Sequence, residues 1–459
     1  MKQNHTGLAK TYCLKETPLL TRQSQQESNA RSYPRRIPLV LAKAQGIYVQ
    51  DTKGQVYIDC LAGAGTLALG HNHPVTISAI QNALHAQLPL HTLDITTPIK
   101  DAFVQELMDC FPKAFSKNAR IQFCGPSGAD AVEAAIKLVR TATGKHSLLA
   151  FHGAYHGMTL GTLSVSGDLG SKSELGALVA GTQFLPYPNA FRCPFGLSGE
   201  ASINASLSYI RNCLEDPYSG ITHPAGMILE TVQGEGGVLP APSTWLQGIR
   251  ELTKKHAIPL ILDEIQCGIG RTGDMFAFEQ SGILPDVITL SKAIGGGLPL
   301  SVVVYKDELD AWKPGAHAGT FRGNQLAMAA GTETLKFIKQ NNLTENAQQM
   351  GQRFFKHLLE LQSEFHWIGD VRGRGLMLGM EIIDVDNVPS HSTLGEQPLC
   401  DAHRASRFQR ACLERGLIIE LGGREGATAR LLPPLIVTES EVNHILDIMF
   451  EAARAISQN

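Results

Sequence analysis

Short apolar runs alternate with amphipathic segments through the middle of the chain. Strands are expected at six such runs, which span residues 121–123, 147–151, 226–229, 258–262, 287–290 and 300–305. Between several of them the apolar positions recur at helical spacing, as they do at 129–141 and 244–256. Nearly continuous apolar strands that alternate with helices are typical of a mainly parallel sheet covered on both faces. The pattern therefore predicts an α/β domain over residues 75–344.

The N-terminal part of the chain lacks this alternation. Two apolar runs, 46–49 and 56–58, flank turn-forming residues at 51–54, and this arrangement predicts a β-hairpin. Residues 1–35 show no clear period, so we expect them to form an irregular arm. We interpret residues 1–74 as an N-terminal arm and hairpin that belong to a small domain.

The C-terminal part changes character again. Helical patterns at 346–362 and 402–415 bracket a strand-like segment at 375–383. The polar stretch 384–397 is expected to be a loop. These features predict a smaller α+β domain over residues 345–459.

Composition and charge narrow the class of protein. The chain has 459 residues and a net charge of −3, which gives nucleic acid no basic surface to bind. No N-terminal signal and no run of about 18 apolar residues is present, so we expect a cytoplasmic protein without a membrane span. The nine cysteines form no C-x-x-C pair, which argues against a disulfide framework and a thiolate zinc site. Cys124 and Cys267 are interpreted as packing residues.

Two polar side chains each follow a buried-type strand. Asp263 ends the run 258–262, and Lys292 follows the run 287–290 and precedes three glycines that would leave room for a planar ligand. Ligands of open α/β sheets bind beyond the carboxyl ends of the strands. A carboxylate there can stabilise a cationic ring nitrogen, and a desolvated lysine is a nucleophile that forms imines. Each residue alone is more often simply solvated, but the pair is seldom accidental.

Two further motifs suit a flat, phosphorylated ligand. Ser127 precedes a helical pattern that begins with small residues, and a helix N-terminus of this kind binds phosphate, although an ordinary capped helix has the same signature. Tyr155 follows a strand and could stack on a ring. His152 and His156 are four residues apart, as in some zinc sites, but the neighbouring glycines disfavour the continuous helix that such a pair needs.

Together these motifs resemble the class III aminotransferases, from about Tyr33 to Pro434. The resemblance implies an α/β protein of pyridoxal-phosphate fold type I, with a large domain built on a mainly parallel seven-stranded sheet plus a smaller α+β domain. It implies pyridoxal 5'-phosphate as cofactor, a ping-pong mechanism, and small amino acids and 2-oxo acids as substrates. Lys292 matches the catalytic lysine that holds the cofactor as an imine and then carries the proton.

The same resemblance assigns the other contacts with the cofactor. Asp263 matches the partner of the ring nitrogen, and Gln266 matches the residue near the phenolic oxygen. Thr320 matches a threonine that reaches the phosphate in the neighbouring subunit, which implies an obligate homodimer with shared active sites and leaves a higher oligomer open. The implied set of cofactor-binding residues is Ser127, Gly128, Ala129, Tyr155, His156, Asp263, Gln266, Lys292 and Thr320.

Four residues are implied in substrate binding. Arg430 matches the arginine that binds the α-carboxylate of 2-oxoglutarate, with Arg424 as a less well aligned competitor. Without the family context, Arg430 could equally form a surface salt bridge. Glu235, one of two family glutamates, matches the residue that pairs with that arginine when an ω-amino substrate is bound. Tyr33 and Arg322, together with Arg35, are candidates for holding the α-carboxylate of the amino donor, because a carboxylate needs a fork-shaped donor.

One departure bears on the substrate. Ornithine, acetylornithine and 4-aminobutyrate aminotransferases typically have Gly-Arg-Thr where this chain has Gly157-Met158-Thr159. Segments 61–67, 233–238 and 319–324 are instead similar to those of enzymes that transfer an amino group between L-2,4-diaminobutanoate and 2-oxoglutarate. The resemblance therefore implies supply of diaminobutanoate for diaminopropane, siderophore or related biosynthesis. Another ω-aminotransferase, or a pyridoxal-phosphate aminomutase, stays open as an alternative.

Overall fold

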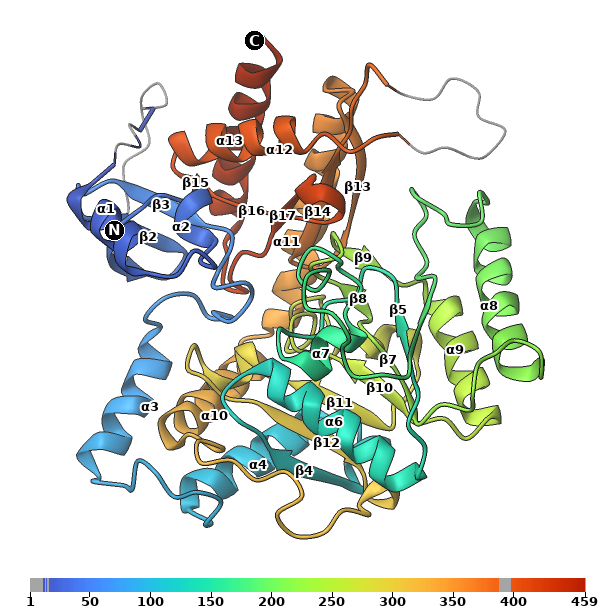
Figure 1. The fold of residues 1–459 in the computed structure, drawn as a ribbon. Coiled ribbons are helices and arrows are strands. Elements are labelled where there is room, and N and C mark those ends of the chain that lie inside the picture. Colours follow the sequence, from blue (N-terminus) through green and yellow to red (C-terminus); the bar gives the residue numbers. More distant parts are fainter. Residues whose placement is uncertain (1–10, 13, 15, 388–397, 459) are drawn as a thin grey trace.

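The computed structural model describes residues 11–12, 14, 16–387 and 398–458. Its largest sheet, in this described part, has seven strands in the order β4 (Ala119–Phe123), β12 (Val302–Lys306), β11 (Val287–Leu290), β10 (Leu260–Asp263), β7 (Gly226–Leu229), β5 (Leu148–Phe151) and β6 (Thr182–Leu185) (Figure 1). β12 runs antiparallel to both of its neighbours, and the other strands are parallel. The mainly parallel seven-stranded α/β sheet is thereby confirmed.

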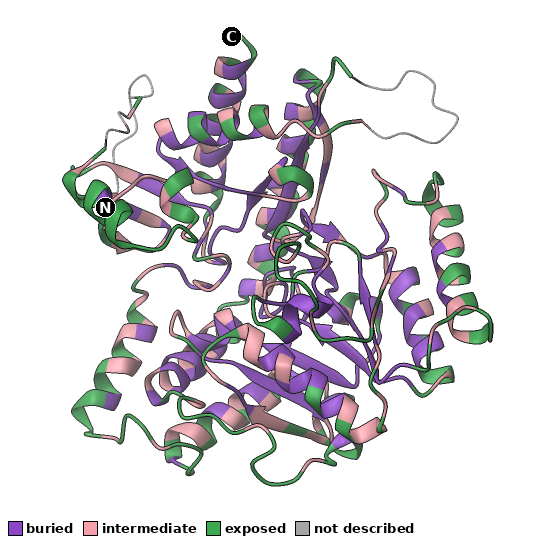
Figure 2. Ribbon diagram, in the orientation of Figure 1, coloured by how far each residue is buried: buried purple, intermediate pink, exposed green. Residues whose placement is uncertain are grey.

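Both faces of this sheet are covered. Along β10, Ile261 packs into a cluster with the apolar face of α6 (Gly128–Thr143), whereas Leu260 and Leu262 belong to the larger core on the opposite face. Successive strand residues point to opposite faces, so both positions must be apolar when both faces are buried. Figure 2 shows the central strands of the sheet as a buried layer, whereas the edge strands β4 and β6 are partly exposed. This burial accounts for the uninterrupted apolar runs in the sequence.

β6 is the strand that no apolar run predicted. It lies at the edge of the sheet, next to β5 alone. Only Leu185 among its residues is fully buried, and Gln183 is exposed. An edge strand with polar residues shows no continuous apolar run, so its sequence resembles a loop.

The C-terminal part forms a second, antiparallel sheet. Its strands are β13 (Ile368–Arg374), β14 (Met377–Ile382), β17 (Thr428–Leu431) and β16 (Glu420–Gly422), in that order. The helices of this part are α11 (Leu343–Glu364), α12 (Ala402–Glu414) and α13 (Glu439–Ser457). Helices and antiparallel strands are combined as the sequence predicted for this part. The domain boundaries at residues 74/75 and 344/345 stay a prediction.

A third sheet joins the beginning of the chain to its end. The predicted hairpin is present as β2 (Tyr48–Asp51) and β3 (Val56–Asp59), with β1 (Leu41–Gln45) beside β2. β15 (Leu417–Ile418) pairs in parallel with β3. Figure 1 accordingly shows the blue N-terminal strands beside the red C-terminal helices.

The expectation of an irregular arm over residues 1–35 is wrong for much of the described part. Residues Pro18–Gln26 form α1, and Tyr33–Arg36 form the short helix α2. Thr17 caps α1 by accepting a hydrogen bond from the backbone N–H of Leu20. Leu20 is the one buried residue of α1, so this helix has no apolar stripe that could reveal it.

Parts of the expected N-terminal arm and of the expected polar loop cannot be compared with the structure. Residues 1–10, 13 and 15, and residues 388–397 of the expected polar loop, lie outside the described residues. Within the described part, no helix combines the length and the apolar character that a membrane crossing needs.

Candidate active site

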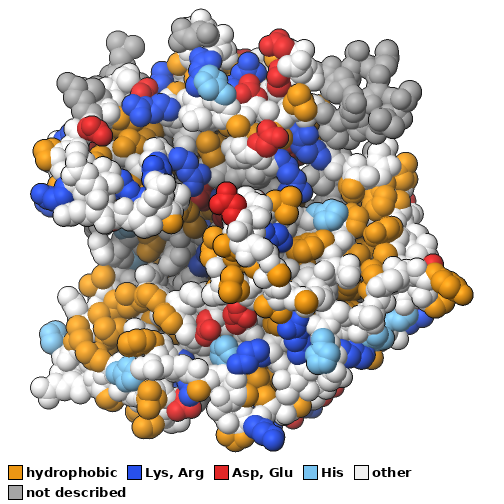
Figure 3. Space-filling view, in the orientation of Figure 1, with side chains coloured by type: hydrophobic (Ala, Val, Ile, Leu, Met, Phe, Trp, Pro, Cys, Tyr) orange, Lys and Arg blue, Asp and Glu red, His pale blue; other side chains and the backbone are white. Residues whose placement is uncertain are grey.

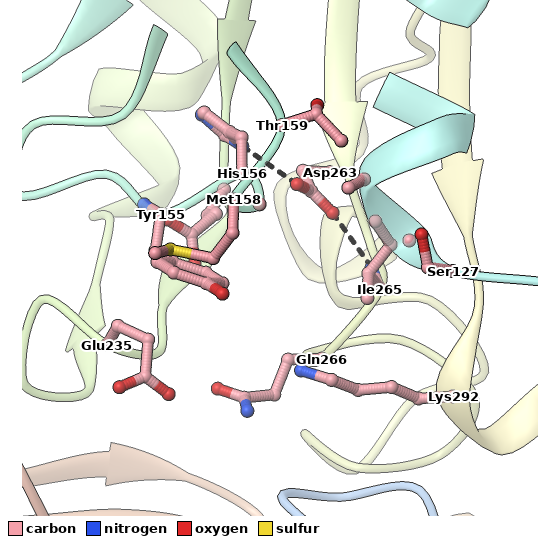
Figure 4. Close-up of a pocket in the computed structure, with 14 residues that line it drawn as sticks. Ser127, Tyr155, His156, Met158, Thr159, Glu235, Asp263, Ile265, Gln266 and Lys292 are labelled. Atoms are coloured by element: carbon pink, nitrogen blue, oxygen red, sulfur yellow. Dashed lines mark hydrogen bonds and ion pairs between the residues drawn. The ribbon is translucent and has the colours of Figure 1, made fainter. Parts of the chain in front are cut away.

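A cavity of about 430 Å³ opens at the carboxyl ends of the large sheet. It brings together all of the predicted cofactor residues except Thr320, together with Glu235. The lining residues are Ser127, Gly128, Ala129, Tyr155, His156, Gly157, Met158, Thr159, Glu230, Glu235, Asp263, Ile265, Gln266 and Lys292. Figure 4 shows the Lys292 side chain extending into the cavity towards Gln266, with Glu235 beyond it. The individual roles of these residues stay predictions.

Lys292 is held in an uncommon backbone conformation. Its φ angle is +48°, in the left-handed region that residues with a Cβ rarely occupy. The preceding Ser291 donates a hydrogen bond of 2.8 Å from its hydroxyl to the carbonyl of Leu300, which fixes the turn at the end of β11. Strained residues of this kind cluster at active sites because the surrounding fold holds them there.

The environment of Lys292 favours its neutral amine. Burial lowers the pKa of Lys292, and the charge of Arg430 acts in the same direction. The carboxylates of Glu235, Asp263 and Glu230 act in the opposite direction, but burial is the larger influence. A neutral amine is the form that can attack a carbonyl group or accept a proton.

The glycines after Lys292 have a different role from the one expected. They do not line the cavity. A Cβ on Gly296 would lie 2.9 Å from the backbone of Ala330 in α10 (Gln325–Gln340), so this glycine permits close packing of the turn on a helix.

Asp263 is buried, and it pairs with His156. Its Oδ2 lies 2.7 Å from the Nδ1 of His156, and its Oδ1 accepts a hydrogen bond of 3.0 Å from the backbone N–H of Ile265 (Figure 4). Burial by itself lowers the pKa of His156, but the hydrogen bond and the charge of Asp263 outweigh it and raise the pKa above its usual value. Asp263 is therefore a carboxylate oriented by a histidine. In the described chain, His152 and His156 belong to no group of atoms spaced for a metal ion.

The start of α6 forms the opposite corner of the cavity. Ser127 is the N-cap residue, as expected, but its side chain makes no capping hydrogen bond and remains available to a ligand. A Cβ on Gly128 would lie 2.9 Å from the end of the Ile265 side chain, so a larger residue here would require that side chain to shift. The positive end of the helix dipole and small residues at its start suit an anionic group.

Glu230 links two loops of the cavity and was not among the predicted site residues. It follows β7 directly, and it accepts hydrogen bonds from the backbone N–H groups of Tyr155, at 3.0 Å, and Gly234, at 2.9 Å. Burial raises the pKa of Glu230 to about 7. Its position after an apolar strand is the same signal that pointed to Asp263, so the sequence could have revealed it.

Arg430 lies in the interior, so the interpretation as a surface salt bridge is wrong. It is 0% exposed, in β17. Its Nη2 lies 2.9 Å from both carboxylate oxygens of Glu235 and 3.0 Å from Oε2 of Glu420. Burial lowers the pKa of Arg430, but the two carboxylates outweigh burial and raise it. The competitor Arg424 is exposed and lines a neighbouring cavity that also includes Glu235.

Tyr33 contacts Glu420, a partner of Arg430 that the sequence did not single out. Its hydroxyl donates a hydrogen bond of 2.7 Å to Oε1 of Glu420. Burial raises the pKa of Glu420, while the charge of Arg430 acts in the opposite direction. Glu420 lies opposite Arg430 because β16 pairs with β17 in an antiparallel register, and no local sequence pattern predicts that pairing.

Gln266 is anchored beside the predicted ring-binding residues. Its side-chain amide donates a hydrogen bond of 3.0 Å to the carbonyl of Ala64, in the segment 61–67 that the sequence singled out. Cys124 and Cys267 are both buried, and burial raises the pKa of each thiol, which confirms them as packing residues.

Three predicted residues lie elsewhere in the chain. Arg322 donates hydrogen bonds to the carbonyl of His317 and to Asp94, at 3.0 and 2.9 Å, and it does not line the cavity. The carbonyl of Thr320 is 2.8 Å from Nε2 of His91, and this contact is exposed like that of Arg322 with Asp94. Arg35 bonds backbone carbonyls near α2. Within one chain, these residues are not brought to the site.

The side chains in the cavity fit pyridoxal phosphate. A lysine with a lowered pKa, a buried carboxylate backed by a histidine, a free serine hydroxyl at a helix start and a tyrosine ring match its aldehyde, ring nitrogen, phosphate and flat face. The Nε2 atom of His156 is buried and has no hydrogen-bond partner in the described chain, so its ring has one polar position still to satisfy. This donor set is that of a site for an amine-transferring cofactor.

The model of the class III aminotransferases matches residues 29–453, and the chain belongs to this family. It is 53% identical to the diaminobutyrate–2-oxoglutarate aminotransferase of Rhizobium meliloti over 426 residues. The matched residues make up 93% of this chain and 90% of that protein. It is 51% identical over 427 residues to the enzyme of the same name from Haemophilus influenzae, which covers 93% of each chain. The resemblance inferred from the motifs is thereby confirmed.

Solved structures agree with the fold. An amine transaminase from an uncultivated Pseudomonas species, in its PLP-bound form, superimposes with a TM-score of 0.82 at 27% identity, over 93% of this chain and 97% of that chain. An aminotransferase of Bacillus anthracis gives a TM-score of 0.84 at 25% identity, over 95% and 98%. The expected fold class is confirmed, with the cavity placed at the carboxyl ends of the large sheet.

Proposed function

We propose that this chain is a diaminobutyrate–2-oxoglutarate aminotransferase that uses pyridoxal phosphate. The reaction interconverts L-2,4-diaminobutanoate and 2-oxoglutarate with L-aspartate 4-semialdehyde and L-glutamate. The observation that carries this proposal is the identity of 53% and 51% to enzymes of that name, over nine-tenths of the chain. The exposed Met158 in the cavity, where ornithine and 4-aminobutyrate aminotransferases typically have arginine, supports the same substrate.

Bound pyridoxal phosphate supplies an aldehyde that condenses with amines and a ring that withdraws electrons from the bond that reacts. Asp263, fixed by His156, would hold a proton on the ring nitrogen. Ser127 and the N-terminus of α6 would bind the phosphate, and Tyr155 would cover the ring face. Gln266 would lie near the phenolic oxygen.

Lys292 would move the proton in both half-reactions. It would hold the cofactor as an imine in the resting enzyme, and a substrate amine would free its amino group by taking its place. The free amine of Lys292 would then serve as base and acid, accepting a proton from the substrate carbon that carries the amino group and donating it back in the same half-reaction. Burial lowers the pKa of Lys292, which favours the neutral form of the amine that would accept this proton.

The pairing of Arg430 with Glu235 lets one cavity serve two substrates. With the pair closed, Glu235 occupies the arginine and offsets its charge, and this suits the diamine end of diaminobutanoate. When Glu235 moves aside, Arg430 can bind a carboxylate of 2-oxoglutarate. Glu235 has the freedom for this movement, because its side chain is 36% exposed.

We further propose that the enzyme is a homodimer with shared active sites. Large apolar side chains are exposed on the segments that flank His91 and Thr320, namely Leu90, Leu93, Ile95 and Phe321. Figure 3 shows hydrophobic side chains gathered on the face over α3 (Pro74–His85). Exposed apolar patches mark interfaces, and Thr320 and Arg322 would reach the partner's cavity from this surface. A higher oligomer, the cytoplasmic location and the pathway that is served stay predictions.

The spectrum of the purified enzyme tests the substrate directly. Diaminobutanoate added without an oxo acid should remove the visible band of the bound cofactor, and 2-oxoglutarate should restore it. A band that responds to ornithine or 4-aminobutyrate, but not to diaminobutanoate, would keep the class and overturn the substrate. Turnover of diaminobutanoate without any oxo acid would instead indicate an aminomutase.

A further inference from the structure

Arg430 pairs with a second carboxylate, Glu420, which unlike Glu235 is buried. Glu420 in β16 stands directly opposite Arg430 in β17, in antiparallel register. Side chains at such positions share one face of the sheet and contact each other. Their exposed fractions are 3% for Glu420 and 0% for Arg430, so the contact is closed to solvent.

The two carboxylates differ in their freedom to move. Glu235 lines the cavity and is 36% exposed. Glu420 belongs to a strand, is almost fully buried, and accepts a hydrogen bond from Tyr33 through its other oxygen. Moving Glu420 would therefore break a buried network, whereas moving Glu235 would not. Glu235 is the exchangeable partner of the arginine and Glu420 is the fixed one.

Arg430 also has N–H donors that no described residue accepts. A guanidinium has five N–H donors, and the two carboxylates both approach Nη2. Nε and Nη1 are buried and have no hydrogen-bond partner among the described residues. A substrate carboxylate can thus take the place of Glu235 while Glu420 stays in contact with the arginine.

We propose that Glu420 determines specificity by offsetting the charge of Arg430 at the substrate end of the cavity, whether or not Glu235 is paired with the arginine. Glu420 is a positioning residue that acts through Arg430 and Tyr33. A dicarboxylate then meets an arginine whose charge is already offset, while the extra ammonium group of a diamino acid meets a net negative cluster. This inference rests on the proposed function for its pair of substrates.

Glu420→Gln tests the proposal because it removes the charge and keeps the size and an oxygen for Tyr33. Glutarate, a dicarboxylate without the reactive oxo group, is titrated into the holoenzyme by calorimetry, and the diaminobutanoate half-reaction is followed by its spectrum. We expect glutarate to bind roughly tenfold more tightly and the half-saturating diaminobutanoate concentration to rise by a similar factor. A merely structural role would weaken both ligands.

Two further variants complete the experiment. Glu420→Asp withdraws the carboxylate by one methylene and should shift both ligands in the same directions by a smaller factor, even where the glutamine variant folds poorly. Asp286→Asn removes a buried carboxylate from another arginine, Arg250, away from the cavity, and should change neither ligand.

Parallel weakening of both ligands, or no change in either, would overturn the proposal. A wild-type enzyme that ignores diaminobutanoate would overturn the proposed substrate only. In that case the glutarate titration still decides the role of Glu420, since tighter binding in the glutamine variant supports it and unchanged binding refutes it.

Discussion

The two ends of the cavity are built in different ways. At the end that we propose holds the cofactor, Asp263 is the last residue of β10 and Lys292 lies two residues beyond β11, and both strands are central in one sheet. At the end that we propose binds substrates, Glu235 lines the cavity from a loop after β7 and contacts Arg430. Behind it, Arg430 and Glu420 come from the C-terminal sheet and Tyr33 from an N-terminal helix. We therefore expect the chemistry common to the family to depend on one sheet, and selectivity to depend on contacts between distant segments. Substitutions should therefore separate rate from preference.

Lys292→Ala should have the largest effect, because it removes the group that we propose binds the cofactor and moves the proton. We expect turnover to fall by at least about 10³-fold, with loss of the band of the bound cofactor. Steady-state rates and the absorption spectrum provide the measurement. Lys336→Ala, a surface substitution whose lysine pairs with Glu333, is the control and should leave both unchanged. Substantial turnover in the Lys292 variant would contradict its assignment.

Asp263→Asn should come next. The amide keeps the shape of the side chain but removes the negative charge that orients His156 and would hold the ring proton. We expect the rate with every amino donor to fall by about 10²-fold, because a buried charge at the reacting group is lost. Rates with diaminobutanoate and glutamate check this. A loss confined to one donor would place Asp263 at the substrate end instead.

Met158→Arg should change preference more than rate. Met158 is 56% exposed in the cavity, so a longer side chain can be accommodated there. A guanidinium at this position offers a fork to a distal carboxylate and repels an extra ammonium group. We expect the ratio of kcat/KM for 4-aminobutyrate to that for diaminobutanoate to rise about tenfold. Met158→Lys, which supplies charge without the fork, should give a smaller rise, and equal rises would argue against bidentate binding.

Glu230 should make stability depend on pH, with the smallest of these effects. Burial raises its pKa from 4.5 to about 7, so the folded protein binds this proton more tightly than the unfolded chain. Its contribution is present below pH about 4.5 and is lost as the pH rises through about 7, by up to about 3 kcal/mol. Urea unfolding of Glu230→Gln should therefore show a shallower decline between pH 5 and 8. Parallel declines in the variant and the wild type would exclude this residue as the cause.

The sequence predicted those features that depend on the residues of one strand alone. An apolar run buried on both faces reveals both a central strand and the polar residue that follows it, and this is how Asp263 and Lys292 were found. The edge strand β6 and the polar helix α1 carry no such signal. Their positions depend on packing against other segments rather than on their own periodicity.

Cross-strand contacts were beyond the reach of the pattern. Glu420 opposes Arg430 because β16 pairs with β17 in one particular register, and a shift of one residue would turn its side chain to the other face. The two residues are not part of one recognisable sequence motif. The same holds for Tyr33, which reaches Glu420 across 387 positions of the sequence.

The parallel pairing of β15 with β3 has a consequence for the growing chain on the ribosome. Ile58 and Asp59 cannot find Leu417 and Ile418 until nearly the whole polypeptide has been made. At about 5–20 residues per second, roughly 20 to 70 s pass between the two strands. During that time the edge of β3 carries unpaired backbone groups, which are a template for association with other chains. Chaperones that shield the nascent hairpin should therefore govern the yield of this protein more than its final stability does.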